Sequence, residues 1–261
     1  MALIGTLTSS VSALSNFTEG LEVIGNNIAN VNTTGYKSSS ASYSDSFSNT
    51  LRAATSVDSS RQTGTGVQLA GISTNYTQGS ISTTGVSTDL AISGEGYFIV
   101  QDPNSGAQYI TRDGSFKFDD NGYLVNASGL RVLDSASAPI QIPTTGVQSK
   151  SISSNGAVSY VDTAGVTHTV ATVGLAQVAD QAKLMKEGGN LYDYSATTVA
   201  IGIPGSNGTG AFKTYSLELS NVDLTAELTN MITMQRSFQA NARIVTVSDT
   251  ILDDIVNMKR S

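Results

Sequence analysis

Residues 224–258 read LTAELTNMITMQRSFQANARIVTVSDTILDDIVNM, and this stretch decides the fold. Its apolar residues recur at alternating steps of three and four, which is the spacing of a coiled-coil seam. A seam through positions 224, 228, 231, 235, 238, 242, 245, 249, 252 and 256 has only two polar members, Gln235 and Asp249. Asp223 is a suitable N-cap residue. The pattern predicts a long helix from about Asp223 to Met258.

The N-terminus carries a matching stripe, which predicts a helix from about Leu3 to Asn30. The stripe consists of Leu3, Leu7, Val11, Leu14, Leu21 and Ile28. A single narrow stripe does not make a helix stable by itself, so each terminal helix needs a partner. We therefore expect the two to pair as an antiparallel coiled coil. The alternative is that the C-terminal helix packs on the middle of the chain.

The middle of the chain is patterned as strands and turns. Residues 66–72 and 89–93 alternate, Tyr97–Val100 is an apolar run, and a last strand is expected from Phe212 to Leu219. Asp113-Gly114, Asn121-Gly122 and Asn155-Gly156 are dipeptides that supply the positive φ of tight hairpin turns. These signals predict a mainly antiparallel β domain.

The fold class expected from these patterns is α+β, in four segments. They are an N-terminal helix (1–33), a bridging segment (34–63), a central β domain (64–218) and a C-terminal helix (219–261). Within the bridging segment, Ser38 to Gln62 shows no clear period and is rich in Ser, Thr and Ala. We expect it to be an extended arm, or a stretch ordered only by its neighbours.

Charge and composition exclude some kinds of partner and some kinds of site. The chain has 261 residues, of which 14 are Lys or Arg and 21 are Asp or Glu, giving a net charge of −7. No basic patch follows a phosphate backbone, so we expect no nucleic acid. Cysteine is absent, which excludes disulfides and thiolate sites. Low charge with many small polar residues suits a surface that packs against copies of itself.

We expect neither a secretory signal nor a membrane span in this sequence. The first basic residue is Lys37, whereas a signal peptide needs a positive region before an apolar core. No run of about 18 apolar residues occurs, so we expect no membrane insertion. If the protein is exported, we expect a route that leaves the N-terminus uncleaved.

No catalytic, cofactor or metal site is expected. The single histidine, His168, has no Gly-x-Ser-x-Gly context near it, and a lone histidine in an alternating strand is usually a surface residue. Asp119-Asp120-Asn121-Gly122 faintly resembles a calcium loop, but the first and twelfth positions would be Lys117 and Ser128. Gly64-Thr-Gly66 and Gly94-Glu-Gly96 do not open helices, which argues against a dinucleotide site. The terminal seams point to assembly instead.

Several runs resemble the bacterial flagellar axial proteins, the family of rod and hook subunits. The resemblance is close in LEVIGNNIANVNTTGYK (21–37) and continues in TQGSI (77–81), TDLAISGEGYF (88–98), YITRDGSF (109–116) and NGYLV (121–125). It ends in LSNVDL (219–224) and MITMQRSFQAN (231–241). These runs span both ends and the middle in the family's order.

The resemblance implies a structural subunit and not an enzyme. It implies export through the flagellar type III apparatus, an inner tube built by the paired terminal helices and an outer layer built by the β domain. The implied partners are further copies in a helical polymer, neighbouring rod, hook and hook-junction proteins, and the export apparatus and hook cap during assembly. The implied location is the flagellar hook or the basal-body rod.

The resemblance favours a short hook protein with a single β domain. FQANAR (238–243) and the ending IVNMKR (255–260) are more similar to hook proteins. The short length argues for a distal rod protein, which is the alternative. A secreted β-domain adhesin or a glycan-active enzyme is a remote third reading.

The residues expected to form the assembly interface come from the two seams and the bridging segment. Tyr43 and Phe47 are expected to dock on neighbouring subunits. Leu14, Leu21 and Ile28 are expected to face Met231, Phe238 and Val245 across the helix pair. The full set is Leu7, Leu14, Leu21, Ile28, Tyr43, Phe47, Leu228, Met231, Phe238, Val245 and Leu252.

Overall fold

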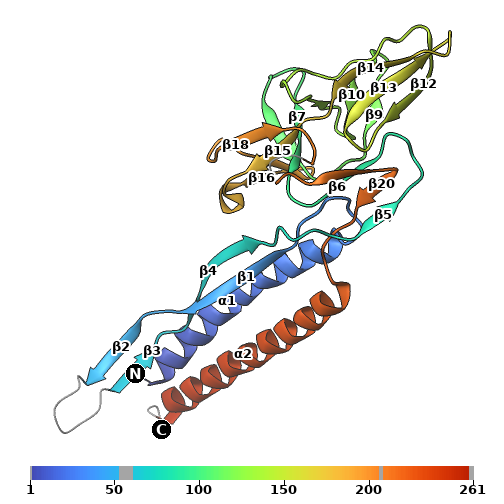
Figure 1. Ribbon diagram of the computed structural model, residues 1–261. Coiled ribbons are helices and arrows are strands. Elements are labelled where there is room, and N and C mark those ends of the chain that lie inside the picture. Colours follow the sequence, from blue (N-terminus) through green and yellow to red (C-terminus); the bar gives the residue numbers. More distant parts are fainter. Residues whose placement is uncertain (1, 53–60, 206–207, 259–261) are drawn as a thin grey trace. The chain divides into compact units, whose positions relative to one another are not determined.

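The computed structural model of the chain describes residues 2–52, 61–205 and 208–258. The chain folds into two compact units (Figure 1). Unit 1 comprises residues 1–29, 38–75 and 222–261, and unit 2 comprises residues 30–37 and 76–221. The combination of two terminal helices with antiparallel strands confirms the α+β class.

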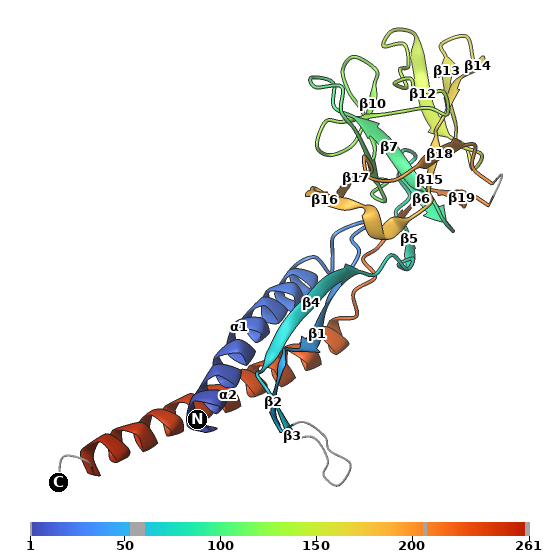
Figure 2. The ribbon, with the colours of Figure 1, turned by 90° about the vertical axis from the view of Figure 1, so that its left-hand side faces the viewer.

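Unit 1 is built on the two long helices, α1 (Ala2–Ala29) and α2 (Leu224–Met258). They run side by side in opposite directions (Figures 1 and 2). The carboxylate of Asp223 accepts hydrogen bonds from Thr225 N at 2.9 Å and Ala226 N at 3.2 Å, so it caps α2 as the sequence predicts. The expected helix bounds are confirmed to within about a residue at each described end.

Four strands complete unit 1: β1 (Ser39–Asp45), β2 (Ser48–Arg52), β3 (Arg61–Gly64) and β4 (Val67–Thr74). Strand β1 pairs with β4, and β2 pairs with β3, both antiparallel. The described parts of the stretch from Ser38 to Gln62 are thus mostly regular strand rather than an extended arm, and residues 53–60 of that stretch lie outside the described residues. The alternation of β1 was hidden because small Ser and Ala side chains occupy both of its faces.

The boundary between the units differs from the expected one. The sequence places residues 64–75 in the central β domain, whereas the structure groups them with the helices in unit 1. The reason is strand pairing: β4 bonds to β1 over the whole length from Ser39–Thr74 to Asp45–Val67. Backbone hydrogen-bonding groups of a strand must be paired, and β1 supplies that partner.

Unit 2 is mainly antiparallel β, as expected (Figure 1). Strand β7 (Tyr97–Gln101) is the centre of its largest sheet and pairs with β8 (Gln108–Thr111), β11 (Arg131–Val132) and β15 (Leu175–Val178). The sheet continues through β9 (Lys117–Phe118), β10 (Leu124–Val125), β16 (Met185–Gly188), β17 (Leu191–Asp193) and β18 (Val199–Gly202), and a single-turn η1 (Gln181–Lys183) precedes β16.

Smaller sheets complete unit 2. Strands β12 (Val147–Ile152), β13 (Ala157–Asp162) and β14 (Thr167–Thr172) form a three-stranded sheet. Strand β6 (Leu90–Ser93) pairs with β19 (Ala211–Thr214), and β5 (Ile81–Thr83) pairs with β20 (Ser216–Glu218). The last expected strand, Phe212 to Leu219, is therefore two strands. Tyr215, which lies between them, has a φ of 56°, outside the strand region.

Two of the three expected hairpin turns are confirmed. Asn121-Gly122 joins the paired strands β9 and β10, and Asn155-Gly156 joins β12 and β13. The prediction for Asp113-Gly114 is wrong, because β8 and β9 do not pair with each other. There the Asp113 carboxylate accepts hydrogen bonds from the backbone N and hydroxyl of Ser115, and a Cβ on Gly114 would overlap the carbonyl oxygen of Leu90. Close packing, not a positive φ, requires that glycine.

The apolar core lies in unit 2. Phe98 packs at its centre, edge-on to Phe116 with ring centroids 4.9 Å apart and stacked on Phe212 at 5.5 Å. Burial of each large apolar side chain contributes about 1.5–3 kcal/mol. Among the described residues of unit 1, only Ala13 and Ile24 are buried apolar residues. The two units therefore differ sharply in how much apolar surface each buries alone.

Candidate assembly surfaces

The two helices of unit 1 meet in an antiparallel register that two contacts define. Asn27 Nδ2 donates to Glu227 Oε1 at 2.9 Å. Seven residues earlier in α1 and seven later in α2, a Cβ on Gly20 would lie 3.1 Å from Met234 Cε. Equal steps in opposite directions are what antiparallel helices with a seven-residue repeat produce.

The side of α2 that is shielded from solvent is shifted by part of a turn from the predicted seam. Glu227, Met234, Asn241 and Ser248 are half-buried or buried, whereas Leu228 and Gln235 are exposed. Of the predicted seam, positions 231, 242, 245 and 252 are also shielded, whereas Phe238 is exposed. At 228, 235 and 249 the residue one position earlier is shielded instead. The shift keeps Gln235 and Asp249 in water and brings small or flexible side chains inward.

Two asparagines of α1 hold the strand pair β1–β4 against the helix. Asn27 accepts from Ser39 N at 2.9 Å and donates to Ser39 O at 2.7 Å. Asn16 accepts from Leu69 N at 2.6 Å and donates to Val67 O at 3.0 Å. Each side-chain amide thus satisfies one donor and one acceptor of a strand backbone. These bonds fix where both strands lie along the helix.

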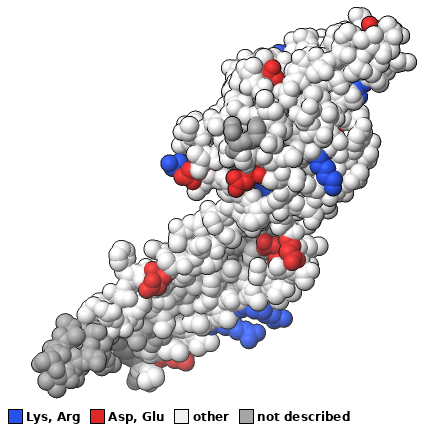
Figure 3. All heavy atoms as spheres, viewed as in Figure 1, with Lys and Arg blue, Asp and Glu red and all other residues white. Residues whose placement is uncertain are grey.

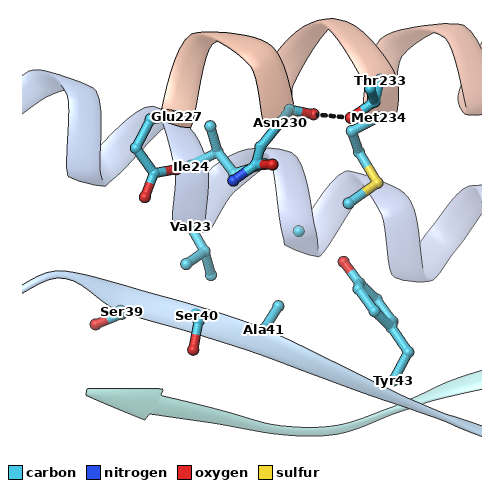
Figure 4. A pocket seen from close by; sticks show the side chains of 11 residues that line it. Val23, Ile24, Ser39, Ser40, Ala41, Tyr43, Glu227, Asn230, Thr233 and Met234 are labelled. Carbon is cyan, nitrogen blue, oxygen red and sulfur yellow. Dashed lines mark hydrogen bonds between the residues drawn. The ribbon is translucent and has the colours of Figure 1, made fainter. Parts of the chain in front are cut away.

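A small pocket of about 190 Å³ lies between α1, β1 and α2 (Figure 4). The Tyr43 side chain from β1 borders it and points toward Met234 of α2. The Tyr43 ring meets Phe17 of α1 edge-on at 6.1 Å, and its hydroxyl lies where a Cβ of Gly20 would be. Only glycine at position 20 leaves room for this ring. Burial raises the pKa of Tyr43, with a smaller contribution from Glu19.

The outer faces of α2 leave apolar side chains in water. Toward its C-terminal end, Ile244, Val247, Ile251, Ile255 and Met258 are all exposed and follow one another at steps of three or four. We call this set the outer stripe. Toward the other end, Leu224, Leu228 and Ile232 form a second exposed set. Charged side chains are sparse on the face shown in Figure 3. Exposed apolar stripes of this length mark interaction surfaces.

A wider groove of about 810 Å³ lies beside the outer stripe. It is bounded by the first turns of α1, by β2 and β3, and by α2 at Asn241 and Ile244. Its α1 wall consists of small residues from Gly5 to Ser10, which leave the groove open. Phe47, at the start of the β2–β3 pair, is 88% exposed.

The predicted interface residues fall into two groups. Half-buried within the chain's own unit 1 are Leu7, Leu14, Leu21, Ile28, Tyr43, Met231, Val245 and Leu252. Exposed are Phe47, Leu228 and Phe238. Tyr43 already packs on its own α1, so it has less surface to offer a neighbour than the sequence suggested. Which of these residues touch a second copy stays a prediction.

Sequence reasoning missed the polar residues that hold unit 1 together. Asn16, Asn27 and Glu227 lie outside the apolar stripes on which the helix predictions rest. The available signal was the seven-residue spacing of 227, 234, 241 and 248, parallel to the apolar seam. Small and polar residues do not contribute to an apolar periodicity.

Within the described residues, no group of three or more His, Asp or Glu side chains is placed to hold a metal ion. His168 stacks on Tyr160 of the neighbouring strand with centroids 5.2 Å apart, on an exposed part of β14. In the described part of the chain, neither helix is long and apolar enough to cross a membrane.

Family profiles match three parts of the chain. Residues 7–37 match the profile described as flagella basal body rod protein. Residues 91–160 match the flagellar hook protein FlgE/F/G D1 domain, and residues 213–258 match the flagellar basal body rod FlgEFG protein C-terminal. The first and last profiles cover most of α1 and α2, and the middle one covers half of unit 2.

Curated relatives match over the full length. The chain is 43% identical to the flagellar basal-body rod protein FlgG of Bacillus subtilis, over 99% of this chain and 100% of that protein. It is 33% identical to FlgG of Borreliella burgdorferi, over 97% of this chain and 98% of that protein. The flagellar hook protein FlgE of Treponema pallidum is 42% identical over 49% of this chain, but over only 28% of its own length. The chain belongs to the flagellar rod and hook protein family, whose members are structural proteins of the bacterial flagellum and not enzymes.

Proposed function

We propose that this chain is a subunit of the flagellar basal-body rod. The observation that supports this most is the end-to-end match to proteins named basal-body rod protein FlgG, at 43% identity over the whole of the relative. A hook subunit, which local sequence runs favoured, is the second candidate. It is supported by a match to a hook protein that covers about half of this chain.

We further propose that α1 and α2 form a coiled coil that packs against neighbouring copies in a helical polymer. The seven-residue register between Asn27–Glu227 and Gly20–Met234 supports the coiled coil. The outer stripe of α2 and the exposed Phe47 supply apolar surface for contacts between copies. Contacts in which one patch meets a different patch on the next copy give an open helical polymer when the rotation between copies does not close into a ring.

Subunits of the rod and the hook differ in what their loss removes from the flagellum. The gene should be deleted in a flagellated host that encodes this chain, and isolated basal bodies should be imaged by cryo-electron microscopy. A rod subunit's deletion leaves a shortened rod without a hook, and the intact gene supplied in trans restores both. Basal bodies with a complete rod but no hook would contradict the rod assignment and favour the hook.

A further inference from the structure

The chain passes between its two units four times, at residues 29/30, 37/38, 75/76 and 221/222. The parts of unit 2 next to these passages are three segments: Asn30–Lys37, residues 76–80 and residues 218–221. We call them the linking segments. When a force pulls on the chain, the contacts that hold these segments decide how firmly they stay attached to unit 2.

One buried carboxylate joins all three linking segments. Glu218 Oε1 accepts from Lys37 Nζ at 2.6 Å and from Gly79 N at 2.9 Å. Its other oxygen accepts from Arg112 NH1 at 3.3 Å. Lys37 and Glu218 are each 1% exposed, and Arg112 is 3% exposed. The segments that begin and end unit 2 are thus tied to each other and to the residue that follows β8.

Backbone hydrogen bonds run alongside this ion cluster. Gly35 N donates to Glu218 O at 2.8 Å, and Leu219 N donates to Ser80 O at 2.8 Å. Asn221 Nδ2 and Lys37 Nζ both donate to Thr77 O, at 3.0 and 2.8 Å. The three segments therefore form one hydrogen-bonded bundle around the carboxylate.

The cluster is not balanced in charge. Among the described ion pairs, Lys37 and Arg112 both contact Glu218, so two cations share one carboxylate. Burial lowers the pKa of Lys37 more than the bond to Glu218 raises it, and Arg112 lowers it further. Within the part of the chain that the structure describes, Arg112 Nε has no hydrogen-bond partner, although its guanidinium lies 4.9 Å from the centre of the Tyr97 ring. Removal of Lys37 or of Arg112 leaves one cation paired with Glu218. Removal of the Glu218 carboxylate leaves two cations without a partner of opposite charge.

We infer that Glu218 is the positioning residue that fastens the three linking segments to the β core, and that it outweighs either of its two cations. Without the carboxylate, two desolvated cations face each other without a counterion, and a glutamine in its place leaves one acceptor oxygen for the donors Gly79 N, Lys37 and Arg112. Without Lys37, Glu218 still holds Arg112 and Gly79, and Thr77 O keeps the Asn221 amide. This inference does not depend on whether the chain is a rod or a hook subunit.

Hydrogen exchange of the full-length monomer, resolved by peptide, tests the inference. In Glu218→Gln, exchange in all three linking segments should speed up by about 100-fold, because breaking a buried pair exposes an uncompensated charge. Strand β7, in the core, should stay protected. Lys37→Met and Arg112→Met should each speed exchange by about tenfold or less. Asp180→Asn is the matched control, since it removes the exposed Lys183–Asp180 pair of the same unit and should change nothing.

Three results would overturn the inference. They are unchanged exchange in Glu218→Gln, an equal loss of protection throughout unit 2 including β7, and an effect of Lys37→Met as large as that of Glu218→Gln. If Glu218→Gln does not fold, Glu218→Asp provides the same test. It keeps the charge but is shorter by one methylene, so the same three segments should open with a smaller change. Exchange in Glu218→Asp identical to wild type would then contradict the inference.

Discussion

At the scale of single residues, Gly35 shows how tightly the linking segments are packed. Its φ is +67°, and a Cβ there would lie 2.6 Å from Asp113 N and 2.7 Å from Arg112 C. Both neighbours are backbone atoms, which cannot rotate away. The residue thus combines a left-handed conformation with a close approach, and each excludes a larger side chain.

Gly35→Ala should destabilise unit 2 by about 2–5 kcal/mol, the sum of a positive-φ penalty and overpacking. Gly85→Ala is the matched control: Gly85 has a φ of +78°, but no atom of the described residues lies within 4 Å of its Cβ position. It should cost only about 1–2 kcal/mol, from the backbone conformation alone. Thermal unfolding of both variants measures the difference. Equal losses of stability in the two variants would show that the contact with Asp113 and Arg112 does not add to the cost of the substitution.

Two buried tyrosines should make unit 2 sensitive to alkali. Burial raises the pKa of Tyr97 and Tyr192 well above 10, and the hydroxyl of Tyr97 has no hydrogen-bond partner among the described residues. Below pH 10 both are neutral in the folded and unfolded states. Above it only the unfolded chain releases these protons, so stability falls by about 1.4 kcal/mol per pH unit for each tyrosine. Lys37 acts in the opposite direction up to pH 10.5, because its pKa is lowered in the fold.

Tyr97→Phe isolates one of these contributions. It removes a buried hydroxyl for which the described residues supply no partner, so it should stabilise unit 2 by about 1 kcal/mol at pH 8. The gain should grow by about 1.4 kcal/mol per pH unit above pH 10. Urea unfolding at pH 8, 10 and 11.5 gives both values. A gain that does not change with pH would mean that Tyr97 ionises in the folded state as easily as in the unfolded one.

At the scale of elements, the outer stripe of α2 is the surface most open to a test. Ile251 lies in its middle and is exposed in the single chain. Ile251→Asp should leave the monomer's circular dichroism unchanged but abolish or strongly weaken polymerisation, because a buried charge without a partner is costly at an interface. Thr250→Asp adds the same charge on the neighbouring exposed position and should polymerise normally. Normal polymers from Ile251→Asp would show that the stripe faces solvent in the assembly.

The elements also show what the sequence could and could not reveal. Both helices were predictable, because apolar residues that recur about every 3.6 positions indicate a helix whatever packs around it. The position of the seam was not predictable. Met234 and Ser248 turn inward in place of Gln235 and Asp249, and this choice depends on where α1 and β1 lie. Strand β1 was missed because Ser and Ala side chains hide its alternation. The bond from Lys37 to Glu218 joins residues 181 positions apart, which no local pattern reports.

At the scale of the whole molecule, the two units bury very different amounts of apolar surface. Both core clusters lie in unit 2, whereas α2 has a single buried residue among those described, Ser248. Fixing each backbone residue costs about 1–2 kcal/mol of conformational entropy. The hydrogen bonds of Asn16 and Asn27 orient the strands of unit 1, but each contributes only about 1 kcal/mol. Unit 1 alone therefore has little with which to offset the ordering of two long helices.

We therefore expect the terminal helices to exchange quickly in the monomer and to become protected only on assembly. At micromolar concentration, amides of α2 from Leu224 to Leu252 should exchange at least about 100-fold faster than those of β7. In the polymer the two rates should converge, since neighbouring copies would cover the exposed stripes and stabilise the helices by mass action. Ile251→Asp is the internal control, because it should keep the monomer pattern at every concentration. Protection of Leu224–Leu252 equal to that of β7 in the monomer would mean that the helix pair is stable by itself and that assembly only joins preformed parts.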